Sequence, residues 1–193
     1  MKKSAKEIPS LDQLQTELAR VRYRSRYRSA LRSTICTLIV AAAVAVLVAT
    51  IWLPVLQIYG SSMTPTLREG DIVVSIKESD FAAGDLVAFY IGNKILVKRC
   101  IALPGQWVDM DENGSVYVDG RRLEEDDLTE KALGDCDLEL PYQVPENRYF
   151  VLGDHRATSI DSRSSVIGCV EKSQIVGKVF LRVWPLSSFS LIH

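Results

Sequence analysis

Residues 34–56 read TICTLIVAAAVAVLVATIWLPVL, and the run contains no charged residue. A helix of about 20 apolar residues crosses the hydrocarbon core of a bilayer, which is roughly 30 Å thick. Trp52 comes near the far end of the run, where an amphipathic ring suits the membrane interface. Pro54 is expected to mark the exit of the helix, because proline interrupts helical hydrogen bonding. The sequence therefore predicts a membrane-spanning helix over 34–56.

A cleaved signal peptide and a buried core helix are the two alternatives for this run. A signal peptide usually has a shorter apolar core with a small-residue cleavage site soon after it. This run is long, begins late in the chain and leads directly into candidate catalytic residues. We therefore expect a retained anchor.

The distribution of charge predicts the orientation of the anchor. The 193 residues contain 23 Lys+Arg and 24 Asp+Glu, but residues 1–33 alone carry nine basic and three acidic side chains. Basic residues accumulate on the cytoplasmic side of a span, so the N-terminus is expected in the cytoplasm and the domain after the span outside. The remainder of the chain is acidic overall, which argues against a protein that binds nucleic acid duplexes.

The basic segment 1–33 also has helical features. Residues 10–13 have the form of a capping box, and Leu11, Leu14 and Leu18 recur at helical spacing. A short amphipathic helix against anionic lipid head groups would explain this pattern. A solvated basic tail is the open alternative.

The sequence after the span predicts a mainly β fold. Short runs rich in Val, Ile, Phe and Tyr, separated by turn signals such as Pro-Gly and Asn-Gly, are typical of an antiparallel β-sheet domain. This domain is expected over 57–193, tethered by the one N-terminal transmembrane helix. The acidic stretch 124–139 is expected to be a solvated insertion. The predicted strands lie at 71–77, 85–90, 95–103, 116–118, 149–152 and 175–184, with a hairpin over 115–123.

The cysteines do not predict a disulfide scaffold or a metal site. Cys36 lies in the apolar run, which leaves Cys100, Cys136 and Cys169 and at most one bridge among them. The sequence has no Cys-x-x-Cys pair and only two histidines. No structural zinc is expected, and no cofactor is implied.

Three segments could carry chemistry, although each has an ordinary structural explanation. Residues 60–67, GSSMTPTL, form a small-residue turn that could expose a serine hydroxyl and backbone N–H groups. On a strand over 95–102, Lys98 would share a face with Leu96, Cys100 and Ala102. If that face is buried, desolvation lowers the pKa of the lysine and makes it a possible general base. Isolated lysines on strands are more often exposed.

The third segment is the polar loop 153–163, GDHRATSIDSR. Ser159, Asp161 and Arg163 could supply a hydroxyl, a carboxylate and a guanidinium to a fixed network. A surface loop with one Asp–Arg pair of modest energetic value is the alternative.

Taken in order, these segments resemble type I signal peptidases, the membrane-bound Ser/Lys proteases of bacteria. The resemblance covers nearly all of Val55–Leu186, including the strand GDIVV at 70–74, Leu-Pro-Gly at 103–105 and FLRVWPL at 180–186. It implies that Ser62 is the nucleophile and that Lys98 accepts its proton. Some family members have a serine two positions before the nucleophile, where this chain has Gly60, so the backbone N–H of Ser62 is expected to bind the oxyanion.

The resemblance also implies supporting roles. Ser159 would orient the lysine, and Asp161 and Arg163 would hold the loop by a salt bridge. Small side chains of an extended substrate would occupy shallow apolar pockets, and the matching positions are Ile58, Met63, Leu67 and Val97. The implied partners are signal peptides of exported preproteins and the phospholipid bilayer.

His155 and Cys100 have no catalytic role in this prediction. In Ser/His relatives the histidine replaces the strand lysine, which is present here as Lys98, so His155 is interpreted as a loop residue. Cys100 is interpreted as a small apolar filler. Two other functions stay open at this point: a maturation peptidase dedicated to one pilus or surface protein, and a non-catalytic membrane-tethered assembly or binding protein.

Overall fold

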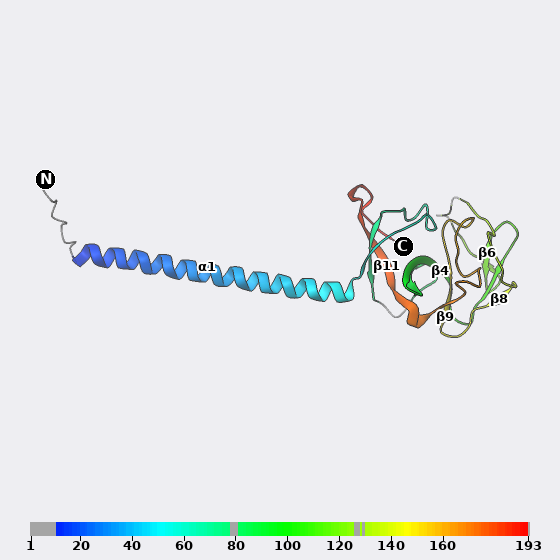
Figure 1. Cartoon of the computed structure of the whole chain (residues 1–193), viewed down its shortest axis with the longest axis horizontal. Coiled ribbons are helices and arrows are strands. Elements are labelled where there is room, and N and C mark those ends of the chain that lie inside the picture. Colours follow the sequence, from blue (N-terminus) through cyan, green and yellow to red (C-terminus); the bar gives the residue numbers. More distant parts are fainter. Residues whose placement is uncertain (1–10, 78–80, 126–127, 129, 193) are drawn as a thin grey trace. The chain divides into compact units, whose positions relative to one another are not determined.

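The computed structural model describes residues 11–77, 81–125, 128 and 130–192. The chain divides into two compact units, residues 1–49 and residues 50–193, and each is considered by itself. Figure 1 shows the long helix and the β domain to which these units correspond.

Helix α1 (Leu11–Trp52) is continuous over 42 residues. None of its residues is buried, and it is long and apolar enough to cross a membrane. Two sequence expectations are corrected. The basic segment and the apolar run form one helix rather than two, and this helix ends at Trp52 instead of Leu56. Pro54 restricts the preceding residue and lacks an N–H, so the chain leaves the helix and continues as a strand. Ser10, the first residue of the capping box, lies outside the described residues.

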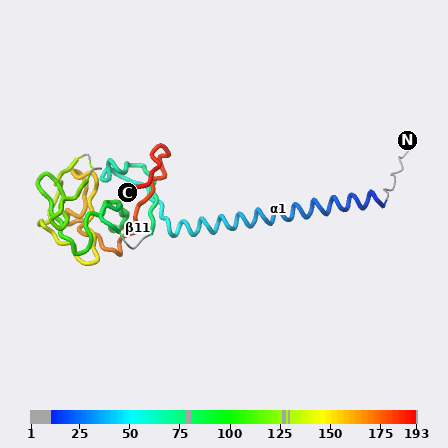
Figure 2. Tube along the Cα trace, turned by 180° about the vertical axis from the view of Figure 1, so that it is seen from behind, coloured from blue at the N-terminus to red at the C-terminus, as the bar shows by residue number. Residues whose placement is uncertain are grey.

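The β domain contains two antiparallel sheets, which confirms the predicted fold class. The larger has the strand order β1-β2-β11-β3-β4-β9-β10, with β12 paired to β11, and the smaller has the order β7-β6-β5-β8. β11, near the end of the chain, lies beside β2, near the start of the domain (Figures 1 and 2). The bounds are β1 (Val55–Gln57), β2 (Ile72–Ile76), β3 (Leu86–Ile91), β4 (Lys94–Ala102), β5 (Trp107–Met110), β6 (Val116–Val118), β7 (Arg121–Arg122), β8 (Tyr142–Gln143), β9 (Arg148–Leu152), β10 (Val170–Glu171), β11 (Ile175–Trp184) and β12 (Ser190–Leu191).

The six predicted strands are all present, as β2, β3, β4, β6, β9 and β11, and β6 and β7 form the predicted hairpin. The short strands β1, β5, β8, β10 and β12 were not predicted. Each of them has only two to four residues, too few for alternation to be recognised, and β6, with three residues, was predicted because turn signals flank it. Helical structure after Trp52 is limited, among the described residues, to the 3-10 turns η1 (Lys172–Gln174) and η2 (Leu186–Ser188).

Three apolar clusters form the core of the β domain. One packs the 60–67 turn against β2, β3 and β11 through Met63, Leu67 and Val73. A second joins β3, β4 and β9. The third packs the smaller sheet onto the ends of β4 and β9. The 60–67 turn and the loop 153–163, which are far apart in the sequence, are therefore both connected to strands of the larger sheet.

The segment 124–139, predicted to be a solvated insertion, has mostly exposed acidic side chains among its described residues, but it also contacts the domain. The Glu125 side chain is only 5% exposed and forms an ion pair with Arg156, and the carbonyls of Ala132 and Leu133 accept hydrogen bonds from Arg163. Buried arginines need such partners, and this need draws an acidic segment onto the domain. Asp126, Asp127 and Thr129 lie outside the described residues.

Candidate active site

Ser62 lies half-buried in the turn that follows β1. The turn is closed by backbone bonds from Thr64 N–H to the Ser61 carbonyl (3.0 Å) and from Leu67 N–H to the Met63 carbonyl (2.8 Å). The Ser62 carbonyl accepts the N–H of His155 at 3.0 Å. Within the described part of the chain, neither the hydroxyl nor the N–H of Ser62 donates a hydrogen bond. Both groups are therefore available to a ligand.

Lys98 lies in the middle of β4 and is only 2% exposed. Its Nζ donates a hydrogen bond to Ser159 Oγ at 2.8 Å. Burial lowers the pKa of Lys98 to about 8, while Asp161 raises it, Arg163 lowers it and Asp154 raises it to smaller extents. Desolvation has the largest effect on this pKa, because the ammonium group loses its hydrating water when Lys98 is buried in the folded domain. A buried lysine with this pKa can accept a proton near neutral pH.

The loop 153–163 holds Ser159 in place through a buried ion pair. Arg163 binds Asp161 in a bidentate manner, with Nε–Oδ1 and Nη2–Oδ2 distances of 2.8 Å each. Asp161 Oδ2 also accepts the N–H of Gly153 at 3.0 Å, and Arg163 Nη2 donates to the Ser159 carbonyl at 3.3 Å. This network connects the backbone on both sides of Ser159.

Gly153 is the point where the turn, the strand lysine and the loop meet. A Cβ atom at this position would lie 2.1 Å from Ser159 Oγ and 2.6 Å from the Ser62 carbonyl oxygen. Any side chain would therefore displace one of the two serines. Because Ser159 is hydrogen-bonded to Lys98, this close approach brings Ser62, Lys98 and Ser159 to one site. None of the hydrogen bonds of the described residues joins Ser62 Oγ to Lys98 Nζ directly.

A second ion pair ties the same three segments together, and sequence analysis missed it. Arg99 binds both oxygens of Asp154, at 2.9 Å from Nε and 2.8 Å from Nη2. Thr66, from the 60–67 turn, donates its hydroxyl to the same carboxylate. The available signal was the Lys-Arg pair itself, since adjacent strand residues point to opposite faces and Arg99 needed a carboxylate of its own.

The predicted alternation along β4 holds up to Cys100 but fails at Ala102. Leu96 and Cys100 pack in one cluster and Val97 in another. A register shift between Cys100 and Ala102 interrupts the pairing with β9, and the adjacent Ile101 and Ala102 both join a third cluster. A β-bulge of this kind adds one residue and reverses the alternation beyond it.

A cavity of about 710 Å³ opens beside Ser62. Of the predicted substrate-binding residues, Ile58, Met63 and Val97 line it, whereas Leu67 is fully buried in the core and does not. The sequence did not single out the other lining residues, which come mainly from β1 and the first half of β4: Val55, Leu56, Gln57, Tyr59, Asn93, Lys94, Ile95 and Leu96.

Two strand edges border this cavity without a strand partner. β1 pairs only with β2, and β4 pairs with β9 from Arg99 onward, so the edge of Lys94–Lys98 away from β3 is open in the described part of the chain. An extended peptide can add a strand to such an edge.

The remaining titratable candidates lie outside the site's chemistry. His155 Nδ1 lies 2.9 Å from the Thr158 hydroxyl, so its ring interacts within its own loop. Cys100 is fully buried, and burial, with a smaller contribution from Asp85, raises the pKa of its thiol to about 12. All four cysteines are free, and the described residues contain no cluster of His, Cys, Asp and Glu that could hold a metal ion.

The family model for signal peptidase, peptidase S26, matches residues 31–184. Signal peptidase IB from Staphylococcus aureus strain COL is 36% identical over 152 residues, which cover 68% of this chain and 78% of that protein. Signal peptidase I P from Bacillus subtilis subsp. natto is 38% identical over 142 residues, with coverages of 67% and 76%. A solved signal peptidase I from Enterococcus faecalis V583 aligns with 28% identity and a TM-score of 0.43, over 51% of this chain and 96% of that one.

The family match includes the end of α1, and it also includes the three segments that meet at Gly153, which are the 60–67 turn, β4 and the loop 153–163. The chain therefore belongs to the signal peptidase family, peptidase S26, and is a peptidase.

Proposed function

We propose that this signal peptidase is a serine endopeptidase that hydrolyses the peptide bond after the small-x-small site of signal peptides, with Ser62 as nucleophile and Lys98 as general base. One observation carries the proposal. The buried Lys98 amine is hydrogen-bonded to Ser159 and held beside the turn that presents Ser62, with a hydroxyl and an N–H free to engage substrate.

The reaction begins when Ser62 Oγ attacks the scissile carbonyl and the neutral Lys98 amine takes the hydroxyl proton. The carbonyl oxygen becomes an oxyanion, which the Ser62 N–H stabilises. When the C–N bond breaks, the Lys98 ammonium returns the proton to the leaving amine and an ester to Ser62 remains. Lys98 then takes a proton from water, whose oxygen attacks the ester carbonyl. When the ester C–O bond breaks, the Lys98 ammonium returns that proton to Ser62 Oγ, and the carboxylic acid product leaves and ionises.

The low dielectric around Lys98 is what makes this base competent. With a pKa of about 8, roughly a tenth of the lysine is neutral at pH 7. An exposed lysine, with a pKa near 10.4, would be neutral in only about 0.04% of molecules. Burial therefore increases the concentration of active base by more than about 100-fold.

The cavity beside Ser62 favours an extended substrate with small side chains. A peptide strand between the open edges of β1 and β4 would run along the cavity and bring its scissile bond to Ser62. Ile58, Met63 and Val97 then form the walls that limit side-chain size near the cut. Leu67 supports Met63 from the core instead of touching substrate.

We further propose that α1 anchors the chain with its N-terminus in the cytoplasm and the β domain at the outer face of the membrane. The basic residues precede the apolar part of the helix, and no charged residue lies between Arg32 and Arg68. The arginines at 20–32 are then placed to contact anionic lipid head groups.

The test is cleavage of a model preprotein with an Ala-x-Ala site by the full chain in liposomes, with the new N-terminus identified by mass spectrometry. We expect a cut directly after the second alanine, absent in Ser62→Ala and preserved in the matched control Ser61→Ala, whose serine is exposed in the same turn. Cleavage by Ser62→Ala would refute the assigned nucleophile. No cleavage by the wild type would favour a dedicated maturation peptidase or a non-catalytic tethered protein.

A further inference from the structure

The segment 124–139 contacts both arginines of the catalytic loop, and the assigned chemistry does not use these contacts. Glu125 is paired with Arg156 through both carboxylate oxygens. Farther along the segment, the carbonyls of Ala132 and Leu133 accept hydrogen bonds from Arg163 Nη1. The segment therefore holds the loop at two points, on either side of Ser159.

Arg156 depends on this contact because its side chain is fully buried. Its Nε donates to the Gly153 carbonyl at 3.0 Å, and its two remaining nitrogens face Glu125. Glu125 Oε2 also lies 3.9 Å from Lys131 Nζ, within the same segment. Removal of the Glu125 charge would leave a buried guanidinium without its counterion, which is strongly unfavourable.

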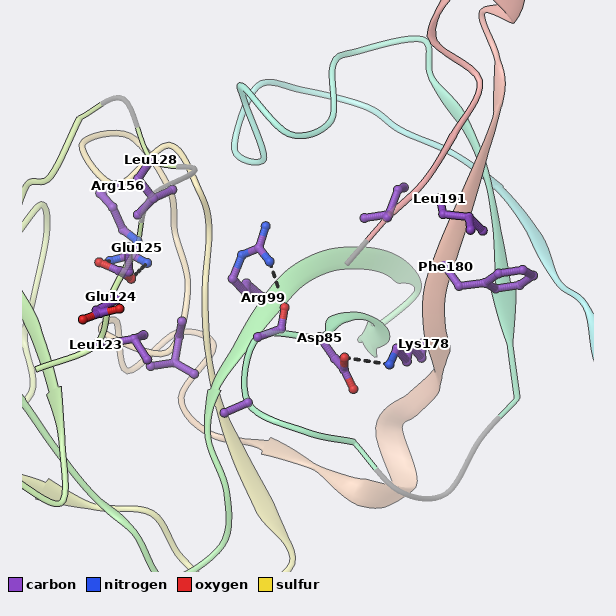
Figure 3. Close-up of a pocket in the computed structure, with 14 residues that line it drawn as sticks. Asp85, Arg99, Leu123, Glu124, Glu125, Leu128, Arg156, Lys178, Phe180 and Leu191 are labelled. Carbon is purple, nitrogen blue, oxygen red and sulfur yellow. Dashed lines mark hydrogen bonds and ion pairs between the residues drawn. The ribbon is translucent and has the colours of Figure 1, made fainter. Parts of the chain in front are cut away.

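The contact between the segment and the loop lies at the edge of a cavity. A cavity of about 620 Å³ separates the Glu125–Arg156 pair from the Asp85–Lys178 pair, as Figure 3 shows. Leu123, Leu128 and Arg156 line it on the side of the segment. On this side the segment holds the loop through the directional contact between Glu125 and Arg156.

The contact between Gly134 and the loop is also close. A Cβ atom on Gly134, at a φ of +61°, would lie 2.6 Å from the Arg156 carbonyl oxygen and 2.7 Å from Arg163 Nη1. Asp137 then fastens the segment beyond the loop, since its carboxylate accepts the N–H and the hydroxyl of Ser165 at 2.7 Å each. The backbone of the segment lies directly against the loop that carries Ser159.

We propose that the segment 124–139 is a brace that holds the catalytic loop in register with β4, and that Glu125 and Gly134 are positioning residues for proton transfer by Lys98. The path is short: Glu125 holds Arg156, Arg156 holds the Gly153 carbonyl, and Gly153 touches both Ser159 and Ser62. This inference rests on the proposed Ser/Lys function.

The first test compares Glu125→Gln with Glu124→Gln in the full chain in liposomes. The neighbouring Glu124 is exposed, so its variant controls for the loss of one negative charge. A loop displaced by about 1 Å reduces catalysis by about 10- to 100-fold. We expect Glu125→Gln to lose kcat by about 10-fold or more with KM unchanged, and Glu124→Gln to match the wild type.

The pH dependence separates positioning from a direct charge effect. Loss of the Glu125 charge by itself would lower the pKa of Lys98, because a negative charge favours the ammonium. A loosened loop admits water and raises that pKa, because desolvation is what lowers it. The brace therefore predicts that the acid limb of kcat/KM moves to higher pH. A limb that moves to lower pH or stays unchanged, or an unchanged kcat, would overturn the proposal.

Gly134→Ala tests the other contact without a change of charge. Gly120→Ala is its matched control, since Gly120 has a φ of +75° but open space around its Cα. Both variants carry the same backbone strain, and only Gly134→Ala pushes against the loop. We expect a loss of kcat in Gly134→Ala alone. Equal rates in the two variants would refute the brace even if Glu125→Gln failed to fold.

A measurement independent of turnover distinguishes failure of the brace from failure of the proposed function. In protein with ¹³C-labelled lysine, the Lys98 signal is identified by its absence in Lys98→Arg. Its titration is then followed by NMR in detergent micelles for wild type, Glu125→Gln and Glu124→Gln. The brace predicts a higher pKa in Glu125→Gln alone. An unchanged titration would reject the brace, whereas absent peptidase activity with the expected titration would reject only the proposed function.

Discussion

The turn 60–67 and the loop 153–163 meet at Gly153 but are built in different ways. The turn is held by backbone hydrogen bonds and leaves Ser62 half-buried, with its hydroxyl free. In the loop, by contrast, polar side chains are buried and paired, and they are Asp154, Arg156, Ser159, Asp161, Ser162 and Arg163.

This difference matches the needs of the two proposed catalytic partners, Ser62 as nucleophile and Lys98 as base. A nucleophile must be open to the substrate, so its segment can be short and simple. A lysine base must be kept from water, and every polar group around it then needs a partner. Among the described residues, no buried side-chain nitrogen or oxygen lacks a hydrogen-bond partner. The loop therefore supplies a dry environment for the base, and the turn supplies access.

Among the predicted changes, Lys98→Arg should cause the largest loss of turnover, because it removes the proposed base. The variant keeps the positive charge, but a guanidinium does not lose its proton in a protein. We expect turnover to fall by about 10⁴-fold or more, measured by cleavage of a signal peptide. Lys172→Arg, at an exposed lysine, should match the wild type. Substantial turnover by Lys98→Arg would show that the assignment of the base is incorrect.

Asp161→Asn tests whether the buried loop depends on its ion pair. Removing one partner of a buried pair leaves an uncompensated charge and costs about 3–5 kcal/mol in the free energy of unfolding. We expect this loss in denaturant unfolding followed by tryptophan fluorescence in detergent micelles. Asp109→Asn, at an exposed carboxylate on the smaller sheet, should cost less than about 1 kcal/mol. Equal stabilities of the two variants would contradict the role of the Asp161–Arg163 pair.

The pH dependence reports how dry the base is. Lys98 is active only as the neutral amine, and its pKa is about 8. kcat/KM should therefore rise with pH, fall about 10-fold for each unit below pH 8 and level off above it. A profile of kcat/KM from pH 5 to 10 measures this. A profile that keeps rising to pH 10 would mean that Lys98 is hydrated and that the loop does not exclude water.

Ser159→Ala should have the smallest effect among these predictions. The variant removes the oxygen that accepts the Lys98 hydrogen bond at 2.8 Å but leaves the nucleophile and the base. We expect kcat to fall by about 10- to 100-fold with KM little changed, measured by steady-state kinetics. A loss as large as that of Lys98→Arg would assign Ser159 a chemical role instead of an orienting one.

Much of this organisation could be predicted from sequence patterns. The apolar run identifies the long apolar helix, the strand periodicity and the turn signals identify six of the strands, and the order of Ser62, Lys98 and the polar loop identifies the family. Two details of the span were wrong because local geometry decided them. The exit at Pro54 was predicted, but the bound at Leu56 was too late because the helix ends two residues before the proline, and no signal separated the basic segment from the apolar run.

The site residues differ in how far the sequence could place them. The roles of Ser62, Lys98, Ser159, Asp161 and Arg163 in catalysis stay predictions, although the structure brings all five together. The partners of Arg99 and Arg156 could not be foreseen, because both are carboxylates distant in sequence. Composition likewise suggested that 124–139 is solvated, since charge runs usually are.

The pattern of residue types along the sequence by itself determined the anchor, the strands and the candidate catalytic groups. Only the tertiary structure decided which of those groups are shielded from water. The pKa of Lys98, the close approach at Gly153 and the burial of Glu125 against Arg156 all arise from contacts between distant segments. The physical reason is that desolvation and ion pairing depend on what surrounds a group in space, and a one-dimensional pattern does not contain that information.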